Sequence, residues 1–333
     1  DDSLIETRNL QIFRSLWGCV KQDGGSYKLS TYLQKIKQEG ATGIECSVGL
    51  AASIPGFAAQ LQQAKLQWIP VVSSCGPLDD ASPFLPGAPT AGPGSSPNVH
   101  FAAWQSQVDA ISSSIGVPPE NVPFVVSFTG HDSMSMSDAM QLIDHTESWF
   151  EQNCSDLYST VMHETHRGKI FYSPWVTKAI IAEVPHLQLV ADLSHFTCVT
   201  EWCSVPSDRN ERLGVDSMDR DMLTEAIDTL ADHFGHIHGR VGSSQSPQVP
   251  DPRSNRWKNE LDTFEHWWKM IWKRRLQKFP EGQFTFTTEH GPPPYQPYFF
   301  KEDDVGILSH VEEVNAWLGK RAQAKFREIY TQS

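Results

Sequence analysis

Side chains that can bind a metal ion or move a proton recur at the ends of apolar runs in the second half of the chain. The ends of parallel strands meet at one mouth in an α/β barrel, so successive runs of this kind would bring their last side chains together. Salt bridges with nearby Arg and Lys side chains are the alternative reading. The candidates are His163, Glu164, Asp192, His236, His238, Glu289 and His290.

Four of these residues, one from each run, predict a metal site: Glu164, Asp192, His238 and Glu289. Two glutamates, an aspartate and a histidine give a mostly oxygen shell. Such a shell suits one divalent Mn, Mg or Co ion and can accept Zn or Fe. A substrate hydroxyl and carbonyl would fill the open positions, and the metal would act as a Lewis acid that lowers the pKa of the adjacent C–H or O–H.

Two further histidines are placed by their spacing from these ligands. His195 follows Asp192 by three residues and could hold a substrate oxygen or shuttle a proton, or simply be a hydrogen-bonded loop histidine. His236 alternates with His238 on one face of the same strand. It should lie one layer deeper and support the ligand from behind.

Several polar and aromatic residues near other strand ends are candidates for substrate contact. Cationic groups among them could hold an anionic or hydroxyl-rich substrate, or could pair with the ligating carboxylates instead. A tyrosine after a rigid Gly-Pro-Pro-Pro turn could shape the site. The candidates are His166, Arg167, Arg240, Glu45, His131, Trp17 and Tyr295.

Alternating β-rich and helical patterns place these residues in eight βα units. We predict strands at 12–19, 42–48, 67–73, 123–129, 158–164, 187–192, 234–240 and 283–289. We predict helices at 28–38, 55–64, 101–115, 137–153, 174–183, 220–232, 257–278 and 308–330. The whole chain, 1–333, is therefore expected to form a single (β/α)8 TIM barrel of the α/β class with rim-loop insertions. No glycine-rich phosphate loop follows any predicted strand, which disfavours a Rossmann or P-loop fold.

Residues 77–98 are rich in Pro, Gly and Ser and should form a rim loop, either a plain insertion or a lid over the site. Trp267, Trp268 and Trp272 lie on one predicted helix. They indicate core packing or a subunit interface, and a homo-oligomer is a possible partner state.

Composition narrows the class of partner. The net charge of −13 argues against a phosphate backbone, so no nucleic-acid partner is expected. No apolar run is long enough to span a bilayer, so no membrane partner is expected either. The six cysteines are scattered, and the N-terminus lacks the basic region of a signal peptide. Both features favour reduced thiols and a cytoplasmic location.

The same residues resemble the xylose isomerase-like TIM-barrel superfamily, which includes sugar phosphate isomerases and epimerases. The resemblance covers nearly the whole chain and rests on residues 43–45, 164, 192–195, 236–238 and 289. It implies that the four predicted ligands bind the metal. In the ketose 3-epimerases of this superfamily the two metal-bound glutamates also move the proton, and the histidine of the DxxH pattern contacts substrate. These roles would fall to Glu164, Glu289 and His195.

Residues 163–168 and 289–295 resemble a less characterised branch, for which no reaction is implied. The epimerases carry a second glutamate six residues after the strand-five ligand, where this chain has Ile170. Related members with the same metal site are dehydratases of cyclic hydroxy-ketones, which begin with the same proton abstraction.

We therefore expect a metal-dependent isomerase or epimerase of a sugar or sugar-like hydroxy-ketone. Glu164 or Glu289 would remove a proton next to a carbonyl, the metal would stabilise the enediolate, and the other carboxylate would return the proton. The alternative is a lyase or dehydratase that uses the same metal and base. Two remoter alternatives are an endonuclease IV-like nuclease, which would need several zinc ions and a basic face, and a non-catalytic carbohydrate-binding barrel.

Overall fold

The computed structural model describes residues 9–19, 28–75, 85–155, 157–203, 217–301, 304–307 and 309–331. Residues 77–84 of the predicted rim loop lie outside this set. The described part of that loop, 85–96, contains two turns but no helix or strand, and the chain enters a helix at Pro97. Its role as a lid stays a prediction.

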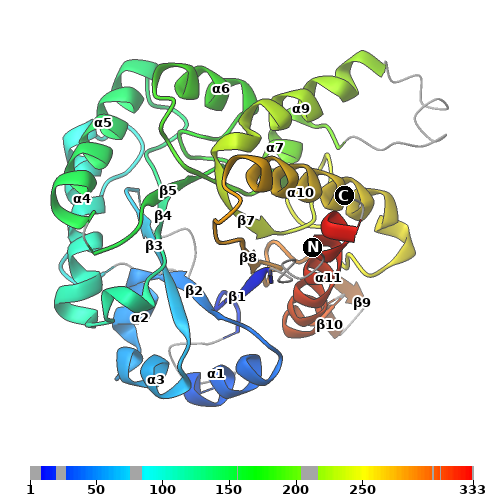
Figure 1. Cartoon of the computed structure of the whole chain (residues 1–333), viewed down its shortest axis with the longest axis horizontal. Coiled ribbons are helices and arrows are strands. Elements are labelled where there is room, and N and C mark those ends of the chain that lie inside the picture. Colours follow the sequence, from blue (N-terminus) through cyan, green and yellow to red (C-terminus); the bar gives the residue numbers. More distant parts are fainter. Residues whose placement is uncertain are drawn as a thin grey trace, which may run out of the picture.

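Eight parallel strands close into one barrel, in which each strand pairs with its sequence neighbour and β1 pairs with β8 (Figure 1). The expected TIM-barrel fold is confirmed. The strands are β1 Gln11–Ser15, β2 Gly43–Ser47, β3 Gln67–Ser73, β4 Val125–Phe128, β5 Val161–Glu164, β6 Leu189–Ala191, β7 Phe234–Gly239 and β8 Thr285–Thr288.

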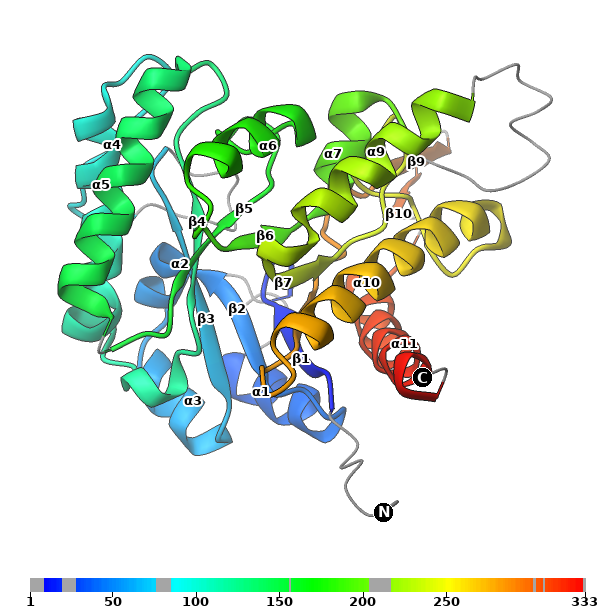
Figure 2. The same ribbon diagram turned by 45° about the horizontal axis from the view of Figure 1, so that its top comes forward.

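Helices follow the strands and surround the barrel (Figure 2). They are α1 Leu29–Gln38, α2 Val48–Ser53, α3 Phe57–Ala64, α4 Pro97–Ala110, α5 Met136–Cys154, α6 Pro174–Glu183, α7 Leu193–Thr200, α9 Ser217–Leu230, α10 Lys258–Lys278 and α11 Val311–Thr331. Trp267, Trp268 and Trp272 are each about 1% exposed and belong to the core under α10, so the core reading of these residues is the one the structure supports.

Alternation along the strands divides side chains between two environments. Phe13, Ile69, Val126 and Met162 belong to a small apolar cluster inside the barrel. Ile237 instead joins the large core beneath the surrounding helices. Every residue of β7 is buried, and His236 and His238 flank Ile237 on the opposite, inward face. The predicted strand period therefore aims these histidines into the barrel.

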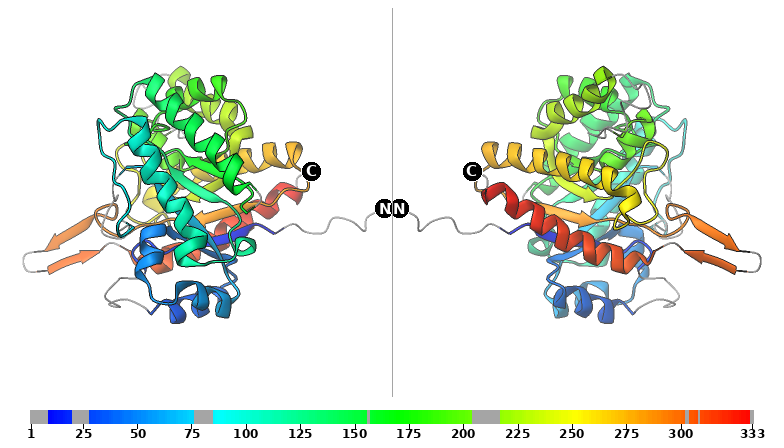
Figure 3. Two further views of the ribbon diagram at one scale, coloured as in Figure 1. Left: turned by 90° about the vertical axis from the view of Figure 1, so that its left-hand side faces the viewer. Right: turned by 90° about the vertical axis from the view of Figure 1, so that its right-hand side faces the viewer.

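Three elements were not expected from the sequence: α2, α7 and an antiparallel hairpin of β9 Tyr298–Lys301 and β10 Asp304–Ile307. The hairpin follows β8, and it projects from the end of the molecule opposite the C-terminal end of α11 (Figure 3). No helix in the described ranges has the length and apolarity needed to cross a membrane.

Candidate metal centre

Three of the four predicted ligands meet at the C-terminal mouth of the barrel. Glu164 ends β5, Asp192 is the N-cap of α7, and His238 lies near the end of β7. One ligand atom from each lies within 4.8 Å of the others. Glu289 follows β8, and its Oε2 lies 3.1 Å from Nδ1 of His238. The structure thus brings all four side chains to one centre.

His238 lies between carboxylates on both sides. Its Nδ1 faces the centre, 3.4 Å from Oε2 of Glu164. Its Nε2 lies 2.9 Å from Oε1 of Glu45, and Thr287 donates a hydrogen bond of 2.6 Å to the other oxygen of Glu45. A carboxylate behind a metal-binding histidine fixes the orientation of the ring and raises its basicity. Glu45, expected to contact substrate, lies on the Nε2 side of His238, away from the centre that Nδ1 faces.

Buried polar atoms without hydrogen-bond partners mark the centre. Both carboxylate oxygens of Glu164, both ring nitrogens of His238 and Oε2 of Glu289 are buried and make no hydrogen bond of good geometry within the described chain. The contacts of these groups, 2.8 to 3.4 Å long, are ion-pair contacts with one another, with Glu45 and with Arg240. Buried polar groups normally have partners, and leaving them unpaired is costly. The atoms converge, and they are the oxygen and imidazole donors that a divalent cation accepts. These residues therefore fit a divalent metal ion.

The carboxylates of this centre differ in their electrostatic surroundings. Burial raises the pKa of Glu164 to about 8, although the nearby His238 opposes the shift. Burial also disfavours the charge on Glu289, but Arg240 and His238 outweigh it and lower its pKa to about 2. Burial raises the pKa of Asp192 as well. For His238, the surrounding glutamates Glu45, Glu289 and Glu164 overcome burial and raise the pKa well above its usual range. Four acids in one buried site favour the uptake of positive charge.

Arg240 supplies a fixed cation beside the ligands. Its Nη2 lies 2.8 Å from Oδ2 of Asp192 and 2.8 Å from Oε2 of Glu289. The guanidinium also lies over the rings of Trp17 and Tyr295, 5.3 Å and 4.8 Å from their centroids. Of the two roles considered for Arg240, the geometry supports pairing with the ligating carboxylates. Trp17 and Tyr295 form the aromatic wall that holds it.

His195 and His166 form a second polar pair next to the ligands. Their ring centroids are 4.0 Å apart, and one nitrogen from each lies within 4.8 Å of an oxygen of Glu164. Nε2 of His195 also lies 3.4 Å from Oδ2 of Asp192. Burial lowers the pKa of His166 to about 3 and that of His195 well below its usual value, so both rings are neutral. A neutral imidazole can donate to or accept from a substrate oxygen.

The other predicted histidines lie outside this centre. His163 points away from it, with its ring nitrogens 2.9 Å from Oε1 of Glu147 and 2.6 Å from Oγ1 of Thr129. His290 contacts Gln248 and Ser309. His131 lies on the rim next to Asp132 and Ser133.

His236 lies deeper in the barrel, as expected. Its two ring nitrogens contact the hydroxyls of Thr285 and Thr287 at 2.7 and 2.9 Å. Since Thr287 also donates to Glu45, His236 and Glu45 share one hydrogen-bonded layer below His238.

One buried cation near the mouth was not singled out from the sequence. Lys169 is about 3% exposed and lies on the same loop as His166 and Arg167. Its Nζ donates to the backbone carbonyl of Cys75 at 3.0 Å. From the sequence alone, a lysine that directly follows a glycine is expected on the surface of a loop. The signal that could have identified it is the short distance in sequence, five residues, from Glu164.

No protein-family model and no curated protein sequence matches this chain. Solved structures do match it over nearly its whole length. An AP endonuclease of family 2 from Brucella melitensis superposes with a TM-score of 0.53 at 13% identity, covering 93% of this chain and 98% of that one.

Two further structures match at similar levels. A xylose isomerase-like TIM-barrel protein from Mycobacterium smegmatis, in complex with magnesium, gives a TM-score of 0.52 at 12% identity, covering 97% of this chain and 98% of that one. A probable 3-DHS dehydratase, AsbF, from Bacillus anthracis gives 0.50 at 14% identity, covering 93% and 98%. The chain therefore shares the TIM-barrel fold of these proteins. Because proteins of different activity share this fold, the activity must be argued from the site.

Proposed function

We propose that this protein is an enzyme that uses one divalent metal ion to remove a proton next to the carbonyl of a sugar or a related hydroxy-ketone. The proposal rests on one observation: Glu164, Asp192, His238 and Glu289 converge, with their side chains buried, at the C-terminal mouth of a barrel. Mouths of such barrels are where active sites lie. When bound there, the ion would supply Lewis-acid polarisation of the substrate carbonyl.

The chain's own residues divide the work of proton transfer. Among the described residues Glu164 has one ion-pair contact, with Nδ1 of His238 at 3.4 Å, and burial raises its pKa to about 8, so it is the carboxylate better suited to take a proton near neutral pH. Glu289 keeps its charge because Arg240 lies against it. Two carboxylates with separated pKa values are the pattern of an acid and base pair. His195 would hold a substrate oxygen beside them.

Return of the proton to the same carbon from the opposite face would make the enzyme an epimerase, and delivery to the former carbonyl carbon would make it an isomerase. Loss of a β-hydroxyl group instead would make it a dehydratase. One observation favours the second outcome. The position six residues after Glu164 holds Ile170, which is about 3% exposed and lies against Gly130, so no second carboxylate is present there. The likeness to a probable 3-DHS dehydratase is in keeping with this second candidate.

Metal analysis of the purified protein tests the proposal. We expect about one divalent ion per chain in the wild type, and loss of most of it in Glu164→Gln, Asp192→Asn, His238→Ala and Glu289→Gln. His163→Gln is the matched control, because His163 is a buried histidine of β5 that points away from the centre. Absence of metal, with no tight uptake of Mn²⁺, Co²⁺, Mg²⁺ or Zn²⁺, would overturn the mechanism.

Exchange of substrate protons then separates the two reactions. In D2O, an isomerase or epimerase should deliver a deuterium to a carbon of its product, whereas a dehydratase should leave the deprotonated carbon in a double bond without deuterium. An isomerase product then has the mass of the deuterated substrate. A dehydratase product is lighter by one water.

A further inference from the structure

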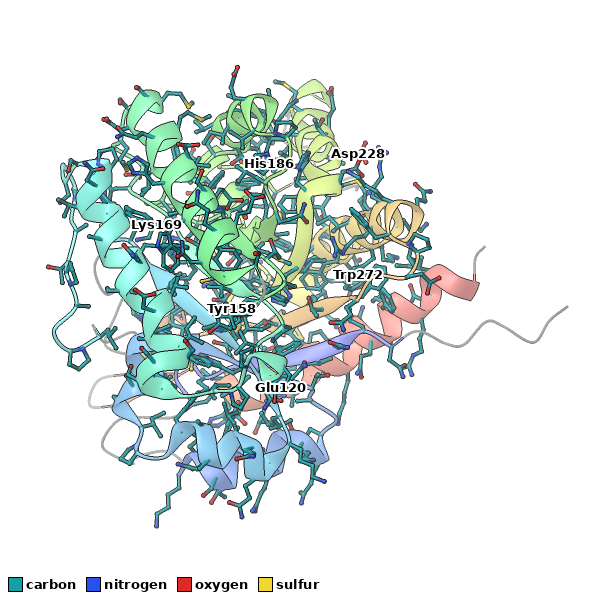
Figure 4. All side chains as sticks on the ribbon, turned by 60° about the vertical axis from the view of Figure 1, so that its left-hand side comes forward. Glu120, Tyr158, Lys169, His186, Asp228 and Trp272 are labelled. Atoms are coloured by element: carbon teal, nitrogen blue, oxygen red, sulfur yellow. The ribbon has the colours of Figure 1, made fainter. Side chains whose placement is uncertain are left out.

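The loop after β5 returns to the barrel through a tight turn. Gly168 has a φ of +77°, a conformation that favours glycine, and Lys169 N donates to the carbonyl of His166 at 3.1 Å. Ile170 N then donates to the carbonyl of Thr129 at 3.0 Å, which fixes the loop to the end of β4. As a result the side chain of Lys169 is buried at the mouth, on the side of α4 and α5 (Figure 4).

Lys169 is a buried cation without a paired anion. An ammonium group has three N–H donors, and the one hydrogen bond that the structure gives it goes to the carbonyl of Cys75. Glu164 and Asp132 act on it through the electrostatic field, but no carboxylate of the described residues forms an ion pair with it. A buried charge is costly unless it is paired. The missing partner is therefore expected to be a ligand.

Arg167, two residues earlier, is a second cation without a paired anion. Its guanidinium lies over the ring of Tyr295, 5.3 Å from the centroid, and Nη1 contacts Sγ of Cys198 at 3.6 Å. No ion pair of Arg167 occurs within the described residues. Arg240, whose guanidinium also lies over the ring of Tyr295, pairs with two carboxylates. The aromatic ring keeps the guanidinium of Arg167 at the mouth.

A buried polar nitrogen lies beside Lys169 as well. His100 of α4 is fully buried, and its Nδ1 lies 3.0 Å from the carbonyl of Ser74, the residue before the Cys75 carbonyl that Lys169 contacts. Lys169, on the loop after β5, and His100, on α4, thus lie together beside the end of β3.

The charges around the centre agree with this reading. The carboxylates of the centre and of the layer below it are Glu45, Glu164, Asp192 and Glu289, which together carry four negative charges when ionised. A divalent ion and Arg240 offset three of these charges. Lys169 and Arg167 then leave the loaded site with one surplus positive charge.

We propose that Lys169 and Arg167 bind an anionic group, a carboxylate or a phosphoryl group, that the substrate carries in addition to its hydroxy-ketone. This inference rests on the proposed function, because it assigns the substrate class of the same site. Charge-assisted hydrogen bonds from Lys and Arg are the usual means of holding either group.

Three small ligands with a common core test the inference on metal-loaded protein. Dihydroxyacetone is neutral, hydroxypyruvate carries a carboxylate on the same hydroxy-ketone, and dihydroxyacetone phosphate carries a phosphoryl group. We expect calorimetric titration to show that one anionic ligand binds at least about 10-fold tighter than the neutral one. Which anion is preferred identifies the group. Lys169→Met and Arg167→Met should each abolish most of that preference and leave the Kd of dihydroxyacetone unchanged.

The stability of the variants provides a second readout. Lys169→Met removes an unpaired buried charge at nearly constant volume, so its Tm should equal or exceed that of the wild type. A structural lysine would give a lower Tm instead. Lys178→Met, on the outer helix α6, is the control and should change neither the preference nor the Tm.

Three results would overturn the inference, and only the third also overturns the proposed function. Equal affinity for all three ligands refutes the anion site while the proposed function stands, since the neutral hydroxy-ketone still binds. A uniform loss of affinity in Lys169→Met, with a lowered Tm, refutes it in the same way. If the protein takes up no metal and none of the three ligands binds, the proposed function has failed and the inference fails with it.

Discussion

His238 is held from behind by Glu45, and this contact yields a prediction for a single residue. The Nε2 of His238 lies 2.9 Å from Glu45, so the carboxylate keeps Nδ1 aimed at the ligands Glu164 and Glu289. Glu45→Gln removes the charge at almost constant volume. We expect affinity for the bound metal to fall by about 10- to 100-fold, as for other groups that orient a metal-binding histidine. Competition with a chromophoric chelator measures it.

Thr287→Val is the companion variant. It removes the hydroxyl that donates to Glu45 at 2.6 Å but leaves the carboxylate in place, so we expect a smaller loss of metal affinity. Unchanged metal affinity in Glu45→Gln would contradict the orienting role. The original prediction that Glu45 contacts substrate would then be the better account of this residue.

At the residue scale, the four side chains that converge at the centre could be chosen from the sequence, but the contacts that they make there could not. Glu164, Asp192, His238 and Glu289 could be chosen because each follows an apolar run, and strand ends of a barrel converge. The sequence could not tell that Arg240 lies between two of these carboxylates, because that depends on side-chain geometry across β7, β8 and α7. Lys169 was overlooked for a similar reason. Its burial is produced by the turn at Gly168.

At the scale of elements, close packing between β1, β2 and β3 depends on one glycine. A Cβ on Gly43 would lie 2.4 Å from the backbone oxygen of Gln67 and 2.7 Å from the ring of Phe13. Because a backbone oxygen in a paired strand cannot move freely, Gly43→Ala should lower the free energy of unfolding by about 1–3 kcal/mol. Urea denaturation measures the change.

Gly92→Ala is the matched control for that substitution. Gly92 lies in the described part of the rim loop, its φ is not in the left-handed region, and a Cβ there would meet no atom within 4 Å. We expect no loss of stability, or a slight gain from the reduced freedom of the unfolded chain. Equal losses in both variants would show that the close contact at Gly43 is not the cause.

The elements themselves were largely predictable, and the exceptions have physical causes. Helix α6 was predicted with its observed bounds because Ser173 caps it and Pro174 occupies its first position. Helix α7 was not predicted because it begins directly after its N-cap, Asp192, which also ended the predicted strand. Its eight residues are rich in Thr, Val and Phe, which individually favour strands. Tertiary contacts decide its conformation.

At the scale of the whole molecule, the start of α11 contacts the first strand and the first helix of the chain. Glu312, in the first turn of α11, receives hydrogen bonds from Tyr32 at 2.8 Å and from Lys35 at 2.6 Å, both on α1. Arg14 of β1 lies 3.6 Å from the same carboxylate. One acid therefore joins the last helix to the first strand and the first helix.

This link makes the stability of the whole fold depend on pH. Burial disfavours the ionised form of Glu312, but hydrogen bonds from Cys19 and Lys35, together with Arg14, outweigh it and lower the pKa below the ordinary value of 4.5. A depressed pKa in the folded state stabilises the fold above the unfolded pKa, and this contribution is lost as the pH falls through the folded value. We expect Glu312→Gln to lower the free energy of unfolding by about 1–3 kcal/mol at pH 7. The difference from wild type should shrink steadily below about pH 4.5.

Glu313→Gln separates this link from a general effect of charge on the helix. Glu313 occupies the same first turn, so both acids interact with the same end of the helix dipole, but its side chain is 62% exposed and its ion pair with Arg253 is 3.5 Å long. We expect a loss below about 1 kcal/mol for this variant. Chemical denaturation of all three proteins from pH 7 to pH 3.5 gives the comparison. A wild-type advantage over Glu312→Gln that does not change with pH would mean that the amide loses packing rather than charge. An equal loss in Glu313→Gln would mean that the dipole, not the contact with β1 and α1, accounts for the stabilisation.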